Sequence, residues 1–93
     1  MAVRDQNPEL YQDLQRRLKR IEGQARGLQR LLEEGVDCDQ VVIQIAAMKA
    51  ALSKVGVRLA ACQLGNRMKE EINQGGDGTR ALDESLEVFN KLS

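Results

Sequence analysis

Residues 38–74, CDQVVIQIAAMKAALSKVGVRLAACQLGNRMKEEINQ, form the stretch that decides the fold. Its apolar side chains recur at alternating spacings of four and three, which predicts one amphipathic helix. The repeat consists of Val41, Ile45, Met48, Leu52, Val55, Leu59 and Cys62. At about 1.5 Å per residue this helix is on the order of 50 Å long, more than a domain of this size covers with its own chain. We therefore expect subunits to share it.

Two further helices flank the central one, at residues 8–34 and 79–92. Asn7 and Pro8 are the N-cap and first residue expected of a helix start, and Gly35 is typical of a helix end. The loop Gly75-Gly76-Asp77-Gly78 separates the central helix from the last one. The sequence thus predicts an all-α, three-helix protomer forming a single domain over residues 1–93.

Composition narrows the classes of function. The chain has 93 residues, 2% of them aromatic, with 14 basic residues balanced by 14 acidic ones and no histidine. An enzyme is not expected, because a cysteine nucleophile would have no histidine base. The N-terminus lacks the apolar run of a signal peptide, and no stretch approaches about 18 consecutive apolar residues, so we expect a cytoplasmic protein without a membrane partner.

The two cysteines, Cys38 and Cys62, lie 24 residues apart in the central helix. About 36 Å separates them within one chain, so they cannot meet there. If the helix pairs antiparallel with its copy about a two-fold axis at Ala50, Cys38 lies near Cys62 of the other subunit. Free N–H groups at the helix start favour an anionic side chain and make Cys38 the better nucleophile. Cys62 is then the resolving thiol or second ligand, or else a packing residue.

A basic stripe lies on the first helix, opposite its apolar face, and consists of Arg16, Lys19, Arg20, Arg26 and Arg30, with Arg17 at its flank. Lys54 and Arg58 form a second basic pair, one turn apart on the central helix. In an oligomer such a stripe becomes a large positive surface suited to DNA phosphates without changing the net charge of each chain. The alternative is a solvated helix face, which is where Lys and Arg usually lie. The residues we expect to contact DNA are Arg16, Arg17, Arg20, Lys54 and Arg58.

The blocks RLKRIEGQARG (residues 17–27) and CDQVVIQIAA (residues 38–47) resemble the CsoR/RcnR/FrmR family of repressors, and the resemblance extends from about residue 10 to residue 92. It implies an all-α dimer of dimers, a homotetramer, that binds operator DNA and releases it when an effector binds. Family effectors are copper, nickel or cobalt, formaldehyde, and persulfides. By position, Cys38 matches the first ligand or nucleophile, and Arg17 and Lys54 match basic positions implicated in DNA contact.

The sequence departs from the family pattern at the effector site. Gln63 stands where copper and nickel sensors carry histidine, and Arg67 where copper or persulfide sensors carry their second cysteine; Cys62 precedes Gln63 by one residue. Asp83 or Glu84 matches an outer-shell acid. We accordingly place four residues in an outer shell around the effector: Gln63, Arg67, Asp83 and Glu84.

These departures from the family pattern let us rank the candidate effectors by the ligands that the chain offers. Nickel and cobalt favour nitrogen and oxygen ligands, so the absence of imidazole disfavours them. Copper(I) tolerates two thiolates, and a dithiol switch needs only two cysteines that meet. We rank persulfide or disulfide chemistry slightly above copper(I) bound by Cys38 and Cys62, with no other cofactor implied. A purely structural helical interaction module is the alternative from another class.

Overall fold

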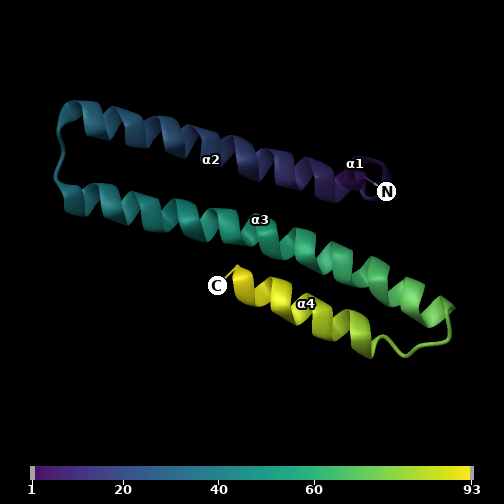
Figure 1. The fold of residues 1–93 in the computed structure, drawn as a ribbon. Helices are drawn as coiled ribbons and strands as arrows, with labels where there is room; N and C mark the ends of the chain where they lie inside the picture. Colours follow the sequence, from purple (N-terminus) through teal and green to yellow (C-terminus); the bar gives the residue numbers. More distant parts are fainter. Residues whose placement is uncertain (1, 93) are drawn as a thin grey trace. The chain divides into compact units, whose positions relative to one another are not determined.

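The computed structural model describes residues 2–92, and the elements in that range are α-helices joined by short loops, without strands. They are α1 (Val3–Gln6), α2 (Pro8–Glu34), α3 (Cys38–Asn73) and α4 (Thr79–Lys91) (Figure 1). The all-α prediction is confirmed, and the three long helices lie within one residue of the predicted limits. The prediction of three helices is wrong by one, because the chain forms a short extra helix, α1, before α2.

The ends of α2 follow from its local sequence. The Asn7 side chain accepts a hydrogen bond from the Leu10 N–H at 3.2 Å, and Pro8 follows in the first turn. At the other end Gly35 adopts the left-handed conformation with φ 74°, and the Val36 N–H donates to the Leu31 carbonyl at 3.3 Å. This hydrogen bond is typical of a helix that ends at a glycine. A residue with a Cβ at position 35 would be strained in the left-handed conformation.

Replacing Asn7 by Ala is expected to destabilise the fold by about 1 kcal/mol, because the Leu10 N–H loses its acceptor. The measurement is chemical denaturation followed by circular dichroism. Asn7→Ser supplies another capping oxygen and should stay close to the wild type. An alanine variant as stable as the serine variant would show that the cap contributes nothing.

The chain divides into two compact units, residues 1–55 and 56–93, with the boundary inside α3. In the first unit, α1 packs on α2, and α2 runs antiparallel to the N-terminal part of α3 (Figure 1). In the second unit, α4 returns along the C-terminal part of α3. There Gly56 allows a close approach, because a Cβ at this position would lie 2.7 Å from Cδ2 of Leu92.

The loop before α4 is stabilised by Asp77, whose side chain accepts a hydrogen bond from the Thr79 N–H at 3.0 Å. The hydrogen bonds from Thr79 hold the pKa of the Asp77 carboxyl below its usual value. A lowered pKa in the folded state means that this stabilisation is present above the ordinary Asp pKa. It is lost as the pH falls through the folded-state value.

The apolar side chains of α3 are not confined to the one predicted stripe, and many of them are exposed in the single chain. Exposed fractions reach 64% at Ile43 and 53% at Leu52. By length and composition alone the helix could cross a membrane, but a single such helix is a weak indication, because core helices of soluble proteins meet the same criterion. Apolar surface of this extent is normally buried, so we expect α3 to pack against another protein surface.

Candidate functional site

A groove of about 390 Å³ lies in the first unit between α2 and the N-terminal part of α3. Cations border it and no carboxylate does. Its lining residues are Arg17, Arg20, Gln24, Ala47, Ala50, Ala51 and Lys54. A concave surface lined by cations without acids attracts an anionic group such as a phosphate.

Helical spacing on both sides builds this groove. Arg17, Arg20 and Gln24 follow one another at three and four residues, which places them on one face of α2. The three alanines and Lys54 share a face of α3 in the same way. Alanine side chains are short, so they leave the space between the longer polar side chains open.

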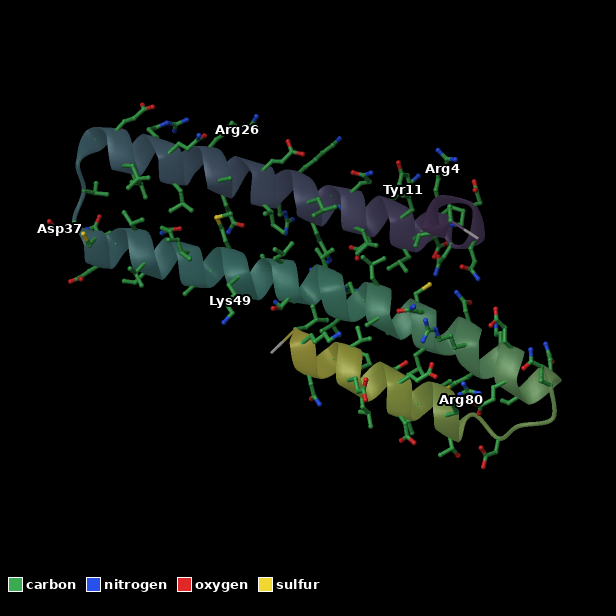
Figure 2. The ribbon with its side chains drawn as sticks, viewed as in Figure 1. Arg4, Tyr11, Arg26, Asp37, Lys49 and Arg80 are labelled. Carbon is green, nitrogen blue, oxygen red and sulfur yellow. The ribbon has the colours of Figure 1, made fainter. Side chains whose placement is uncertain are left out.

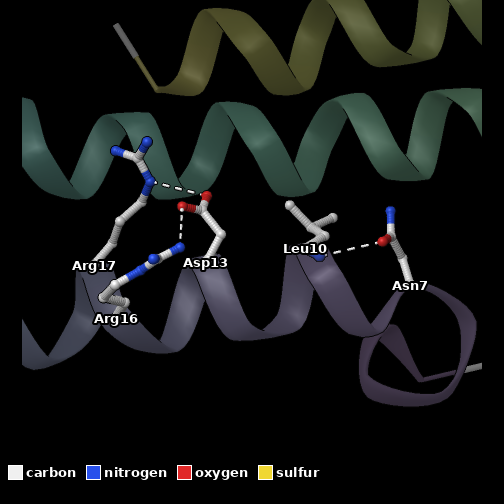
Figure 3. Close-up of polar contacts among 5 residues, drawn as sticks. All are labelled: Asn7, Leu10, Asp13, Arg16 and Arg17. Atoms are coloured by element: carbon white, nitrogen blue, oxygen red, sulfur yellow. Dashed lines mark hydrogen bonds and ion pairs between the residues drawn. The ribbon is translucent and has the colours of Figure 1, made fainter.

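Arg16 and Arg17 are both paired with Asp13, one turn earlier in α2 (Figure 3). The Arg17 Nε lies 3.0 Å from Asp13 Oδ2, and an Arg16 terminal nitrogen lies 3.3 Å from Oδ1. The Arg17 side chain is 29% exposed and that of Arg16 is 69% exposed. Two of the predicted DNA contacts are therefore already engaged with an acid of the same helix.

The other predicted DNA contacts differ in their surroundings. Arg20 and Lys54 are exposed and make no ion pair with any residue in 2–92. Arg58 is exposed too, but it belongs to the second unit and has an interaction partner of its own. The structure thus brings Arg17, Arg20 and Lys54 to one groove in the first unit, with Arg16 beside it.

Gln24 joins this set although the sequence did not single it out. Its Oε1 atom is buried and has no hydrogen-bond partner among residues 2–92. A buried amide oxygen without a partner is costly, and rotation of the glutamine amide by half a turn exchanges its oxygen and its NH₂ group. The side chain can therefore present its amide N–H groups to an anion in the groove.

The two cysteines are free thiols in different units. Cys38 is exposed in the first turn of α3, and Cys62 is half-buried further along the same helix. No cluster of three or more His, Cys, Asp or Glu side chains suited to a metal ion occurs within residues 2–92 of one chain. The predicted contact of Cys38 with Cys62 of a second subunit involves another chain and stays a prediction.

In the second unit, α3 and α4 are joined by charged side chains. An Arg67 terminal nitrogen lies 2.9 Å from Glu84 Oε2, and Arg80 pairs with Glu84 Oε1 at 3.4 Å. The Glu71 carboxylate accepts a hydrogen bond from the Ala81 N–H at 3.1 Å. Two of the four predicted outer-shell residues, Arg67 and Glu84, are therefore direct partners, whereas Gln63 and Asp83 make no ion pair within residues 2–92; all four are exposed.

Sequence reasoning missed Asp13 and Gln24. For Asp13 a pattern was available, because an acid three and four residues before two arginines predicts pairing on a helix surface. For Gln24 no such pattern existed. Its place beside the groove depends on how α2 packs against α3.

Comparison with known proteins adds a family and two copper sensors. The family model described as "Metal-sensitive transcriptional repressor" matches residues 11–91. The chain is 39% identical over 77 residues to the copper-sensing transcriptional repressor CsoR of Bacillus subtilis, covering 83% of this chain and 75% of that protein. It is 38% identical over 63 residues to the copper-sensing transcriptional repressor RicR of Mycobacterium tuberculosis, covering 68% and 66%. No solved structure matches.

Proposed function

The chain belongs to the family of metal-sensitive transcriptional repressors, and from this premise we propose that it binds operator DNA and leaves it when copper(I) binds. We further propose that Cys38 and Cys62 of a neighbouring subunit hold the ion. The family consists of repressors, which agrees with the expectation that the chain is not an enzyme. We expect it to act in the cytoplasm.

The observation that carries the proposed DNA binding is the groove lined by Arg17, Arg20 and Lys54. It concentrates positive charge in a chain whose net charge is zero. Phosphate contacts supply most of the sequence-independent affinity for DNA, and they need local rather than net charge. Repetition of the groove in each subunit of an oligomer would multiply these contacts.

Copper(I) takes first place among the candidate effectors, ahead of the persulfides favoured by sequence reasoning alone. The two curated relatives described above are named as copper-sensing repressors, and no comparison supports persulfide sensing. The donor set fits, because soft thiolates select copper(I) and two of them suffice for linear coordination. Bound copper(I) would cross-link the two α3 helices and change how they pack.

The proposed site requires two subunits, since 24 residues of α3 separate the two thiols of one chain. Pairing α3 with its copy antiparallel about Ala50 opposes Cys38 and Cys62 twice per dimer. The exposed apolar surface of α3 supports such a partner, because surface of this kind is normally covered. We propose an antiparallel homodimer that associates into a homotetramer, with Gln63, Arg67, Asp83 and Glu84 as the surrounding shell.

Leu52→Glu is expected to lower the oligomeric state, because a carboxylate would be buried near the proposed two-fold axis without a partner. The expected molar mass from light scattering shifts from an assembly toward the 10.4 kDa chain. Lys49→Glu introduces the same side chain one turn away at a position that is already charged, and it should keep the assembly. Equal masses for the two variants would contradict the proposed interface.

The experiment that tests the function is a gel shift on the protein's own upstream DNA at two salt concentrations, with and without copper(I) under anaerobic conditions. The repressor proposal expects a specific shift that weakens with salt and disappears with copper(I). No shift at low salt would refute DNA binding and favour a structural helical module. A shift that persists with copper(I) but disappears with an organic persulfide would show that the effector is a persulfide and not copper(I).

A further inference from the structure

The carboxylate of Asp13 pairs with Arg17, which lines the basic groove, and with Arg16, which lies beside it. We propose that Asp13 is a built-in competitor of DNA phosphate, one that restrains Arg16 and Arg17 and thereby limits the affinity of the repressor for DNA. This inference rests on the proposed DNA binding. It adds a residue that sets the strength of that binding without touching DNA.

The geometry engages both oxygens of the carboxylate. Oδ1 pairs with Arg16 at 3.3 Å and Oδ2 with Arg17 at 3.0 Å, so one acid serves two guanidinium groups (Figure 3). The Asp13 side chain is 25% exposed, which shields it partly from water. Charges that are partly buried are screened less by salt than fully exposed ones.

Carboxylates and phosphates are recognised by the same fork of guanidinium N–H groups. A phosphate approaching Arg16 or Arg17 must therefore displace Asp13 or share the arginine with it. In either case the local charge of the three side chains is lower by one unit than that of the two arginines alone. Asp13 consequently reduces both the number and the strength of phosphate contacts on this part of α2.

The rest of the groove lacks such a competitor. Arg20 and Lys54 make no ion pair within residues 2–92, and no carboxylate lines the groove itself. Of the four predicted DNA contacts in the first unit, Arg16 and Arg17 are therefore restrained by Asp13, and Arg20 and Lys54 have no ion-pair partner among the described residues. A repressor must be able to dissociate from its operator. Pairing Arg16 and Arg17 with Asp13 weakens their phosphate contacts, which makes dissociation easier.

The test compares Asp13→Asn with the wild type by fluorescence anisotropy on a duplex from the protein's own upstream region, across a series of salt concentrations. Because exposed ion pairs change an equilibrium constant by at most about fivefold, we expect about two- to fivefold tighter binding for each subunit that contacts DNA. The logarithm of the binding constant should fall more steeply with the logarithm of salt, by about one unit for each additional phosphate that the variant neutralises.

The matched control is Glu22→Gln, which changes the charge of α2 by the same unit. Glu22 is exposed and has no partner among the described residues. A second check is Arg17→Gln combined with Asp13→Asn, in which most of the increase in affinity should vanish. Thermal melts establish that each variant is folded, and Asp13→Glu, which keeps the charge, should bind close to the wild type.

The outcomes separate this inference from the proposed function. A wild type that binds its upstream DNA, together with an Asp13→Asn variant that binds no tighter than Glu22→Gln, overturns the inference and leaves the repressor standing. Weaker binding by a folded Asp13→Asn variant overturns it too, because Asp13 would then be orienting the arginines for DNA. A wild type without DNA binding removes the proposed function and this inference with it.

Discussion

Lys54→Glu is expected to weaken DNA binding on the order of thirtyfold per contacting subunit at low salt. A unit charge about 4 Å from a phosphate is worth about 1 kcal/mol even in water, and this substitution changes the side-chain charge by two units. The affected cation lines the groove together with Arg17 and Arg20. Fluorescence anisotropy at rising salt concentrations measures the loss, which should shrink as screening increases.

Lys49→Glu provides the matched control for this experiment. Lys49 is an exposed residue of α3 that does not line the groove, and Figure 2 labels its position. The control makes the same charge change in the same helix, so it reports the general effect of charge on DNA affinity. Equal losses for the two variants would show that the groove has no special part in binding.

Cys38→Ala and Cys62→Ala are each expected to keep DNA binding and to abolish release by copper(I). Either substitution removes one of two thiolates, and a single thiolate cannot complete even linear coordination from the protein. Gel shifts with anaerobically titrated copper(I) measure release, and an equilibrium competition with a copper(I) chelator measures the affinity of the ion. Loss of DNA binding by a folded cysteine variant would contradict the separation of the two sites.

The two cysteine variants also differ in what they test. Cys38 is exposed at the start of α3, whereas Cys62 is half-buried and suited to packing. A Cys62→Ala variant that still responds to copper(I) would assign Cys62 to packing alone. Intact-mass analysis after exposure to an organic persulfide completes the comparison, because a di- or trisulfide-linked dimer would point to thiol chemistry instead of copper(I).

The limits of the long helices could be predicted because local interactions set them. The Asn7 cap and the left-handed Gly35 involve residues a few positions apart, and sequence patterns report such contacts directly. α1 escaped prediction because a four-residue helix is too short to show a periodic apolar pattern. Of the two glycines inside α3, a Cβ at Gly56 would collide with the Leu92 side chain, whereas a Cβ at Gly65 would meet no described atom outside its own helix segment within 4 Å.

The basic stripe shows where prediction from a single helix ends. Sequence reasoning placed Arg16 and Arg20 together, opposite the apolar face of the first helix. In the structure Arg20 lines the groove, whereas Arg16 turns to Asp13 beside it. A helical wheel gives the directions of the side chains around one helix axis. It does not show where a neighbouring helix packs.

The sequence by itself determined an all-helical chain with a long, apolar central helix, and it identified the family through residues 17–27 and 38–47. Only the tertiary structure decided that Arg17 and Arg20 share a groove with Lys54, and that Arg67 pairs with Glu84. The physical reason is the range of the interactions. Helix formation depends on neighbours within about four residues, whereas these contacts depend on the register in which separate helices pack.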